Sequence, residues 1–368
     1  RVSSLAAGEK QKVEILKQLA LRNRILILDE PTSVLTPQEA DEVLGHLRAM
    51  TLAKQVSVLI ITHKLREVAA FADEVTVLRK GQFVGSGNVS ELNVSQMAEM
   101  MVGSEVTAKP KQRTVLSKKV PKLVLQDIRV KDDIGVEVVR GLHLTIHEGE
   151  IVGVAGVSGN GQRELVEILS GQRQTTSGTI HVQDQPFQST REQIMRHKIF
   201  CLPEEPLQNT CVGRMTVAEN LAFRNFDREP HAVGGWLISR PALRRSAFGL
   251  IERYNIKPPY PDTPIQSLSG GNIQRAVLAR ELSAEVEILI IANPCFGLDF
   301  LAMEEIRLQI VAARNRGTAV LLVSEDLDEI LELSDRTVVM FNGQLVYETT
   351  SSGADLAIIG RHMTGHTT

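Results

Sequence analysis

The 368-residue chain has few cysteines, no long apolar run and little net charge. Its three cysteines, Cys201, Cys211 and Cys295, lack the C-x-x-C spacing of zinc and redox sites, which favours a reduced cytosolic protein. No apolar run approaches the roughly 20 residues that cross a bilayer. A net charge of −3 gives no reason to expect nucleic acid as a partner. With 43% hydrophobic residues the composition is that of a globular protein, and the length predicts two domains.

The sequence contains an internal repeat. Residues 5–11 (LAAGEKQ) align with residues 268–274 (LSGGNIQ), and residues 73–84 align with residues 335–346. Such a repeat predicts two homologous halves, each an α/β domain with its functional groups at strand ends. The second half has a full beginning, whereas the counterpart of that beginning would lie before residue 1. We therefore expect the first half to lack its N-terminal part.

This division gives three segments. Residues 1–106 are expected to form the C-terminal part of a first α/β domain, and residues 123–368 a second one. Residues 107–122 are rich in Lys, Pro and Gln and poor in large apolar residues. They are predicted to be a linker whose basic run is solvated.

The first half carries an acidic pair at the end of a predicted strand. The apolar run from Ile25 to Leu28 leads directly into Asp29 and Glu30. At the carboxyl edge of a parallel sheet, one carboxylate can hold the metal of a Mg-nucleotide and the next can polarise the attacking water. A strand that runs into an acidic turn is the alternative interpretation. His63 follows the next predicted strand and can reach a γ-phosphate at this edge, although a lone histidine there is usually packed or on the surface.

A glycine-rich loop in the second half lies between a predicted strand and a predicted helix. It fits the phosphate-loop spacing G-x-x-x-x-G-K-[ST] at its two outer glycines, but Gln162 and Arg163 stand where Lys and Ser or Thr belong. The backbone amides can still cradle a phosphate, without the lysine and the Mg-binding hydroxyl. The candidate binding residues of this loop are Gly156, Gly159, Asn160, Gly161, Gln162 and Arg163.

The second half has also lost its catalytic groups. The counterparts of the acidic pair are Ala292 and Asn293, and Glu325 stands in the place of His63. A site without metal ligand, base, lysine and histidine is predicted to be a poor hydrolase.

A third motif opens a predicted helix in the second half. Ser269, Gly270, Gly271 and Asn272 offer a hydroxyl and close backbone approach to a terminal phosphate. An N-capped helix after a glycine turn is the alternative interpretation.

Together these motifs resemble the ATP-binding cassette (ABC) ATPases of simple-sugar and nucleoside importers, which carry two cassettes in one chain. The segments behind the resemblance include residues 25–37 (ILILDEPTSVLTP), 153–165 (GVAGVSGNGQREL), 212–221 (VGRMTVAENL) and 268–272 (LSGGN). The resemblance implies two tandem P-loop NTPase domains, ATP and Mg²⁺ as cofactors, and ATP hydrolysis that drives solute import. It also implies integral membrane permease subunits as partners, indirectly a solute-binding lipoprotein, and a location at the cytoplasmic face of the membrane.

In that family, each nucleotide is clamped between the phosphate loop of one cassette and the signature of the other. The resemblance implies that Asp29 holds Mg²⁺, Glu30 orients the water and His63 senses the γ-phosphate. The Ser269 to Asn272 motif would close over that nucleotide. The degenerate loop would face the altered signature around Gly8. One composite site would then hydrolyse ATP while the other mostly holds it, and the polypeptide alone is expected to be inactive.

Two other functions stay open at this stage. A tandem ABC ATPase that acts on ribosomes or DNA would have a long charged arm between its cassettes and a basic surface. An inactive gene fragment is the other alternative. An energy-coupling subunit contacts the permease and not the solute, so the solute would be selected by its partners.

Overall fold

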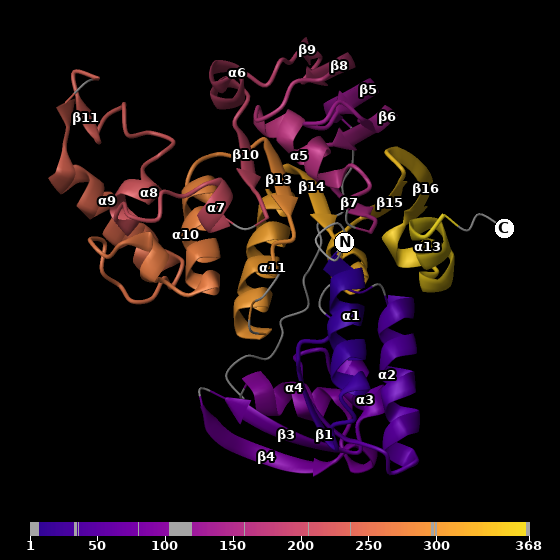
Figure 1. Cartoon of the computed structure of the whole chain (residues 1–368). Helices are drawn as coiled ribbons and strands as arrows, with labels where there is room; N and C mark the ends of the chain where they lie inside the picture. The colour runs from indigo at the N-terminus through magenta and orange to yellow at the C-terminus, as the bar shows by residue number, and fades with distance from the viewer. Residues whose placement is uncertain are drawn as a thin grey trace.

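The computed structural model describes residues 7–32, 35, 37–79, 81–102, 120–157, 159–204, 206–235, 237–295, 298 and 300–365. Most of the predicted linker, residues 107–119, lies outside the described residues. Figure 1 shows the described chain as a lower part, built from the first segment, and a larger upper part, built from the second.

The first segment alternates helices and short strands. Its elements are α1 (Ala7–Ala20), β1 (Ile25–Asp29), α2 (Pro37–Leu52), β2 (Ser57–Ile61), α3 (Leu65–Phe71), β3 (Glu74–Arg79), β4 (Gln82–Asn88) and α4 (Val94–Val102). Strands β1 and β2 pair in parallel, whereas β3 and β4 form an antiparallel hairpin. The strand predicted from Ile25 to Leu28 is confirmed as β1, and the strand predicted before His63 is confirmed as β2.

The second segment begins with an antiparallel sheet. Its first elements are β5 (Pro121–Lys131), β6 (Glu137–His147), β7 (Ile151–Ala155), α5 (Gln162–Ser170), β8 (Ser177–Val182), β9 (Gln185–Pro186), α6 (Arg191–Arg196), β10 (Ile199–Leu202) and α7 (Pro206–Asn209). Strands β6, β5, β8 and β9 form a four-stranded antiparallel sheet in that order.

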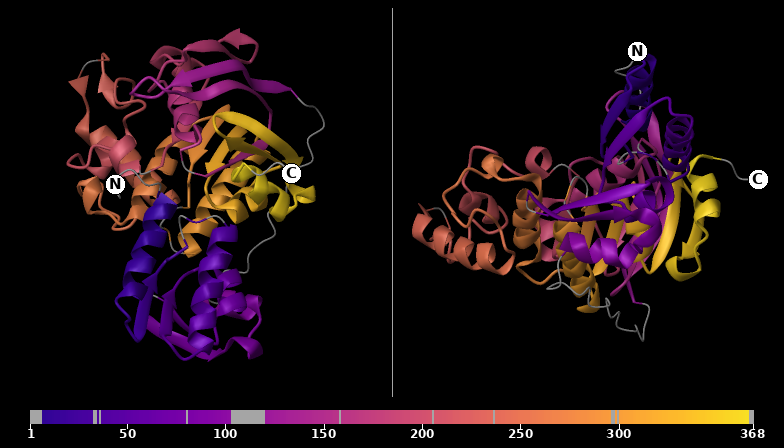
Figure 2. Two further views of the ribbon diagram at one scale, coloured as in Figure 1. Left: turned by 45° about the vertical axis from the view of Figure 1, so that its right-hand side comes forward. Right: turned by 90° about the horizontal axis from the view of Figure 1, so that it is seen from below.

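The rest of the second segment adds a helical part and completes the main sheet. Its elements are α8 (Val217–Leu221), β11 (Ala232–Val233), β12 (Leu237–Ile238), α9 (Arg240–Arg253), α10 (Gly270–Leu282), β13 (Ile288–Ala292), α11 (Phe300–Asn315), β14 (Ala319–Ser324), α12 (Leu327–Leu333), β15 (Arg336–Phe341), β16 (Gln344–Thr350) and α13 (Leu356–Met363). The main sheet has the order β10-β13-β14-β7-β15-β16 and is parallel except for its last pair. Helices α8 and α9 project away from this sheet in Figure 1 and in both views of Figure 2.

The element order of the first segment recurs in the second. The series from α1 to α4 repeats as α10, β13, α11, β14, α12, β15, β16 and α13. Even an irregularity recurs, because the β3–β4 register shifts between Val77 and Leu78 and the β15–β16 register shifts between Val339 and Met340. The repeat predicted from the sequence is therefore also present in the backbone.

The first segment does not form one continuous sheet, because β1–β2 and β3–β4 are separate two-stranded sheets. In the second segment β7 lies between β14 and β15 and joins the two pairs. The described residues of the first segment supply no strand in that place. One face of β1 is also open, with Ile25 and Ile27 69% and 64% exposed, whereas the equivalent Ile288 and Ile290 of β13 are buried in the cluster that includes the antiparallel sheet.

The core of the second segment explains its strand sequences. Residues of β7, β13 and β14 are buried along their whole length, as parallel strands covered on both faces must be. Two hydrophobic clusters cover the two faces, one around helices α10 and α11 and one around the antiparallel sheet. This packing fixes the strand ends that carry the predicted site. Among the described residues, no helix is long and apolar enough to span a membrane.

Candidate nucleotide site

The structure brings two predicted catalytic residues into contact at the ends of β1 and β2. The Nδ1 atom of His63 lies 2.8 Å from Oε1 of Glu30, and the backbone N–H of His63 donates to the same oxygen at 3.2 Å. The other carboxylate oxygen, Oε2, is enclosed by protein and has no hydrogen-bond partner among the residues that the structure describes. Glu30 is therefore held in place through Oε1 alone in this part of the chain.

Asp29 precedes this pair and is exposed at the end of β1. Among the described residues there is no group of three or more His, Cys, Asp or Glu that could hold a metal by itself. A single carboxylate is nevertheless compatible with Mg²⁺, which protein sites often bind through one or two carboxylates together with substrate phosphates and water.

A buried carboxylate that the sequence analysis missed braces the same loop. Thr32 and Glu67 are buried, and Oγ1 of Thr32 lies 2.8 Å from both carboxylate oxygens of Glu67. Lys64 donates to the backbone oxygen of Thr32 at 3.1 Å and lies 3.8 Å from Glu67. Burial raises the pKa of Glu67, and these neighbours oppose the shift. The equivalent Glu329 is also buried and accepts a hydrogen bond from the hydroxyl of Ser324. The recurrence of glutamate at equivalent positions of the two halves was therefore the signal available in the sequence.

In the second segment, the predicted loop and strand ends surround one cavity of about 290 Å³. Gly156, Gly159, Gln162 and Arg163 line it, together with Ala292, Asn293 and Glu325 from the ends of β13 and β14. The motifs predicted to share a site thus do meet. Glu204, Gln208 and Asn209 also line it, although no sequence motif assigned them to the site.

The loop itself is closed by its own side chains. Gln162, in the position of the expected lysine, accepts a hydrogen bond from the backbone N–H of Asn160 at 3.1 Å and donates to the oxygen of Val157 at 3.1 Å. Asn160 also donates to that oxygen, at 2.9 Å. The Gln162 amide thus already occupies one N–H group of the predicted amide cradle, and phosphate binding by this loop stays a prediction. Short-range side-chain hydrogen bonds of this kind compete with a ligand for the backbone.

Arg163 and Gly161 have different roles beside this loop. Arg163 is largely exposed and pairs with Glu167 at 2.7 Å, one turn along α5. Gly161 has φ of 102°, and a Cβ there would lie 2.6 Å from the backbone oxygen of Val138. Glycine is required at this position by both conformation and space.

The end of β13 in the second segment has the same hydrogen-bond geometry as the end of β1, but it lacks the charged carboxylate. The backbone N–H of Glu325 donates to Oδ1 of Asn293 at 2.9 Å, as that of His63 does to Glu30. An amide in place of the carboxylate cannot act as a base, so Asn293 cannot take the role predicted for Glu30.

The predicted signature motifs lie elsewhere. Ser269 precedes α10, Gly270 and Gly271 begin it, and Asn272 donates to Oγ of Ser269 at 2.8 Å. Gly271 packs closely, because a Cβ there would lie 3.3 Å from Leu298. Neither this motif nor Gly8, in the first turn of α1, lines the cavity of the glycine loop.

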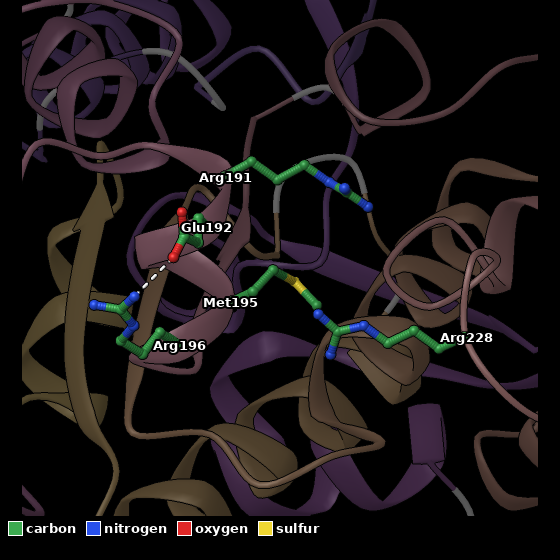
Figure 3. Close-up of a pocket in the computed structure, with 5 residues that line it drawn as sticks. All are labelled: Arg191, Glu192, Met195, Arg196 and Arg228. Carbon is green, nitrogen blue, oxygen red and sulfur yellow. Dashed lines mark hydrogen bonds and ion pairs between the residues drawn. The ribbon is translucent and has the colours of Figure 1, made fainter. Parts of the chain in front are cut away.

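A further cavity of about 530 Å³ lies beside α6. It is lined by Arg191, Glu192, Met195, Arg196 and Arg228. Figure 3 shows Arg196 turned toward Glu192, and their charged groups are 2.7 Å apart. Arg191 is likewise paired, with Asp227. None of the predicted site residues lines this cavity.

Comparison with known proteins finds a matching family model and several related sequences. A sequence profile described as "ABC transporter" matches residues 139–295. The glucose import ATP-binding protein TsgD13 of Haloferax volcanii is 40% identical over 99% of this chain and 66% of its own length. The nucleoside import ATP-binding protein NupA of Lactococcus lactis is 36% identical over 97% of this chain and 71% of its own length. The guanosine import ATP-binding protein NupO of Bacillus subtilis is also 36% identical, over 98% of this chain and 71% of its own length. The chain thus spans about two thirds of the length of these relatives.

Solved structures bear on the fold alone. A nucleotide-free cassette from an ABC transporter superposes with a TM-score of 0.53 at 20% identity, over 63% of this chain and 92% of its own. A dimeric bacterial ABC transporter cassette gives a TM-score of 0.54 at 20% identity, over 63% of this chain and 100% of its own. The predicted α/β cassette fold is confirmed for one domain, and a second tandem copy stays a prediction.

Proposed function

Because the chain belongs to the ABC transporter family of ATP-binding proteins, we propose that it is the energy-coupling subunit of an importer for nucleosides or simple sugars. Relatives named for glucose, nucleoside and guanosine import support this substrate class. The proposal includes integral membrane permease subunits as partners, indirectly a solute-binding lipoprotein, and a place at the cytoplasmic face of the membrane.

The proposed organisation is a tandem of cassettes. Residues 1–106 form the C-terminal part of the first, residues 107–122 the linker and residues 123–368 the second. Its support is the repeated element order, in which each element of the first segment has a counterpart of nearly the same length in the second. Helices α2 and α11, for example, both have 16 residues.

The proposed catalytic centre is at the ends of β1 and β2. Glu30 orients and deprotonates the attacking water, while His63 holds its Oε1 and contacts the γ-phosphate. Asp29 would hold Mg²⁺, which supplies positive charge to the phosphate oxygens when bound. Ser269, Gly270, Gly271 and Asn272 would approach the same nucleotide from the opposing cassette. The Glu30–His63 contact is the observation that carries this proposal.

The cavity beside the glycine loop is proposed as a second, degenerate site that holds nucleotide with little hydrolysis. Gln162 replaces the lysine cation with a neutral amide, and Asn293 and Glu325 replace the base and the histidine. Gly8 belongs to the signature that would face this site.

Uptake by cells that make the complete transporter tests the proposal. Labelled nucleosides and simple sugars are offered separately, and Glu30→Gln is expected to reduce uptake of one class at least tenfold. Glu42→Gln, an exposed glutamate on α2, serves as the matched control and should leave uptake unchanged. Equal uptake by the Glu30→Gln variant, or uptake of neither class by the unaltered protein, would refute the assignment.

A further inference from the structure

Two equivalent turns of the repeat carry opposite charge. The basic turn follows β2 and consists of His63, Lys64 and Arg66. The acidic turn follows β14 and consists of Glu325, Asp326 and Asp328. The neighbouring residues are the same in both turns, because α3 and α12 have leucine and glutamate at matching positions. Charge is thus inverted at two positions, where Lys64 and Arg66 correspond to Asp326 and Asp328, while Glu67 and Glu329 are both buried.

The structure brings these two turns together. One narrow crevice is lined by Lys64 and Arg66 from the basic turn and by all three residues of the acidic turn, with Leu35 and Ala40 beside them. Partial loss of solvent raises the pKa of the Asp328 carboxyl, Asp326 adds to this shift, and Arg66 and Lys64 oppose it. The basic side chains therefore act electrostatically on the other segment across the crevice.

Each turn is held in place by its own segment. Arg66 pairs with Asp41 of α2 at 3.1 Å, and Lys64 donates to the backbone oxygen of Thr32. On the other side, Oδ1 of Asp326 accepts the backbone N–H groups of Asp328 and Glu329 at the start of α12. The charges are consequently ordered before the segments meet, which reduces the entropy lost on docking.

When equivalent elements of two repeats contact each other, an approximate two-fold axis relates the two repeats at that contact. If either segment paired in the same way with a copy of itself, the basic turn would face a basic turn and the acidic turn an acidic turn. Like charges so placed repel, whereas the observed pairing sets opposite charges against each other.

We propose that the basic and acidic turns form a docking surface that pairs the first segment with the second and opposes the pairing of either segment with its own copy. The partner of each turn is the other segment of the same chain. The inference rests on the repeat and on the crevice, and it holds whether or not the chain hydrolyses ATP.

A charge-reversal cycle tests this docking. The folded full chain, with a protease site introduced within residues 107–119, is cleaved, and separation of the two pieces on dilution is followed by sedimentation. Arg66→Glu and Asp328→Arg should each raise the dissociation constant about 2- to 10-fold in low salt, because each turns an attraction into a repulsion. The double variant should return to within about twofold of the original chain. Arg48→Glu, which breaks an ion pair inside the first segment, is the matched control and should have no effect.

Salt provides a measurement that needs no variant. Raising the salt concentration from about 0.05 to 0.5 M shortens the screening length and should weaken the association several-fold. The proposal is overturned if the pieces of the original chain separate readily in low salt, if salt has no effect, or if the double variant dissociates as easily as the single ones. Loss of transport without any change in this cycle would count against the proposed function alone.

Discussion

Glu30 and Asn293 occupy equivalent strand ends with nearly the same backbone conformation, φ being 45° in one and 44° in the other. Each backbone N–H donates at 2.8 Å to the oxygen of the neighbouring strand, that of Ile61 or of Val323. Each side chain accepts a backbone N–H from just beyond that strand, that of His63 or of Glu325. Positive φ is uncommon outside glycine, and its recurrence indicates that the geometry of the site is retained where the carboxylate is not.

The first prediction concerns the closed glycine loop. Gln162→Lys removes the amide that occupies the N–H of Asn160 and adds a cation for phosphate, so we expect nucleotide affinity at this site to rise about tenfold. Titration with a fluorescent ATP analogue measures it. Gln172→Lys adds the same charge to the wall of the same cavity, away from the loop, and should change affinity much less. Equal effects of the two substitutions would contradict the role given to Gln162.

The second prediction concerns the buried glutamate of α12. Burial raises the pKa of Glu329, so the folded state binds its proton more tightly than the unfolded state does. Stability from this group is present in acid and is lost as the pH rises from the unfolded pKa through the raised folded pKa. Glu329→Gln should therefore unfold at a temperature ~2 °C higher than the original chain at pH 7, and the difference should shrink toward pH 4.

Thermal unfolding between pH 4 and pH 8 makes this comparison, with the exposed Glu192→Gln as control. A lower melting temperature for Glu329→Gln at pH 7 would show that its charged form stabilises the fold.

The third prediction separates backbone strain from packing in the glycine loop. Gly159 and Gly161 have φ of 90° and 102°, but a Cβ at Gly159 would meet open space, whereas one at Gly161 would lie 2.6 Å from the oxygen of Val138. We expect Gly159→Ala to cost about 1–2 kcal/mol of unfolding free energy, and Gly161→Ala to cost about 1–3 kcal/mol more. Urea denaturation measures both. Equal losses would mean that the loop relaxes away from the clash.

Part of this site was predictable from the sequence because it depends on strand order. Glu30 and His63 each follow a short apolar strand, and parallel neighbours bring such ends together, so their contact follows from the pattern. The cavity lined by Gly156, Asn293 and Glu325 follows from the same rule.

Other features depend on contacts that a linear pattern does not encode. The inward turn of Gln162 is a choice of side-chain rotamer among competing hydrogen bonds, and the sequence indicated only that a lysine was missing. The bond between Thr32 and Glu67 joins residues 35 positions apart. The separation of β1–β2 from β3–β4 depends on which strand lies between them, and the apolar runs do not contain that information.

The most direct test of the account compares two substitutions at equivalent positions, by ATP hydrolysis in the transporter assembled with its permease subunits. Glu30→Gln keeps the shape of the side chain and removes the base, and it should lower kcat by about 100-fold or more. Asn293→Ala should leave kcat within about twofold, because the second strand end carries no base. Equal losses from the two substitutions, or unchanged hydrolysis in Glu30→Gln, would contradict a single working catalytic centre at Glu30.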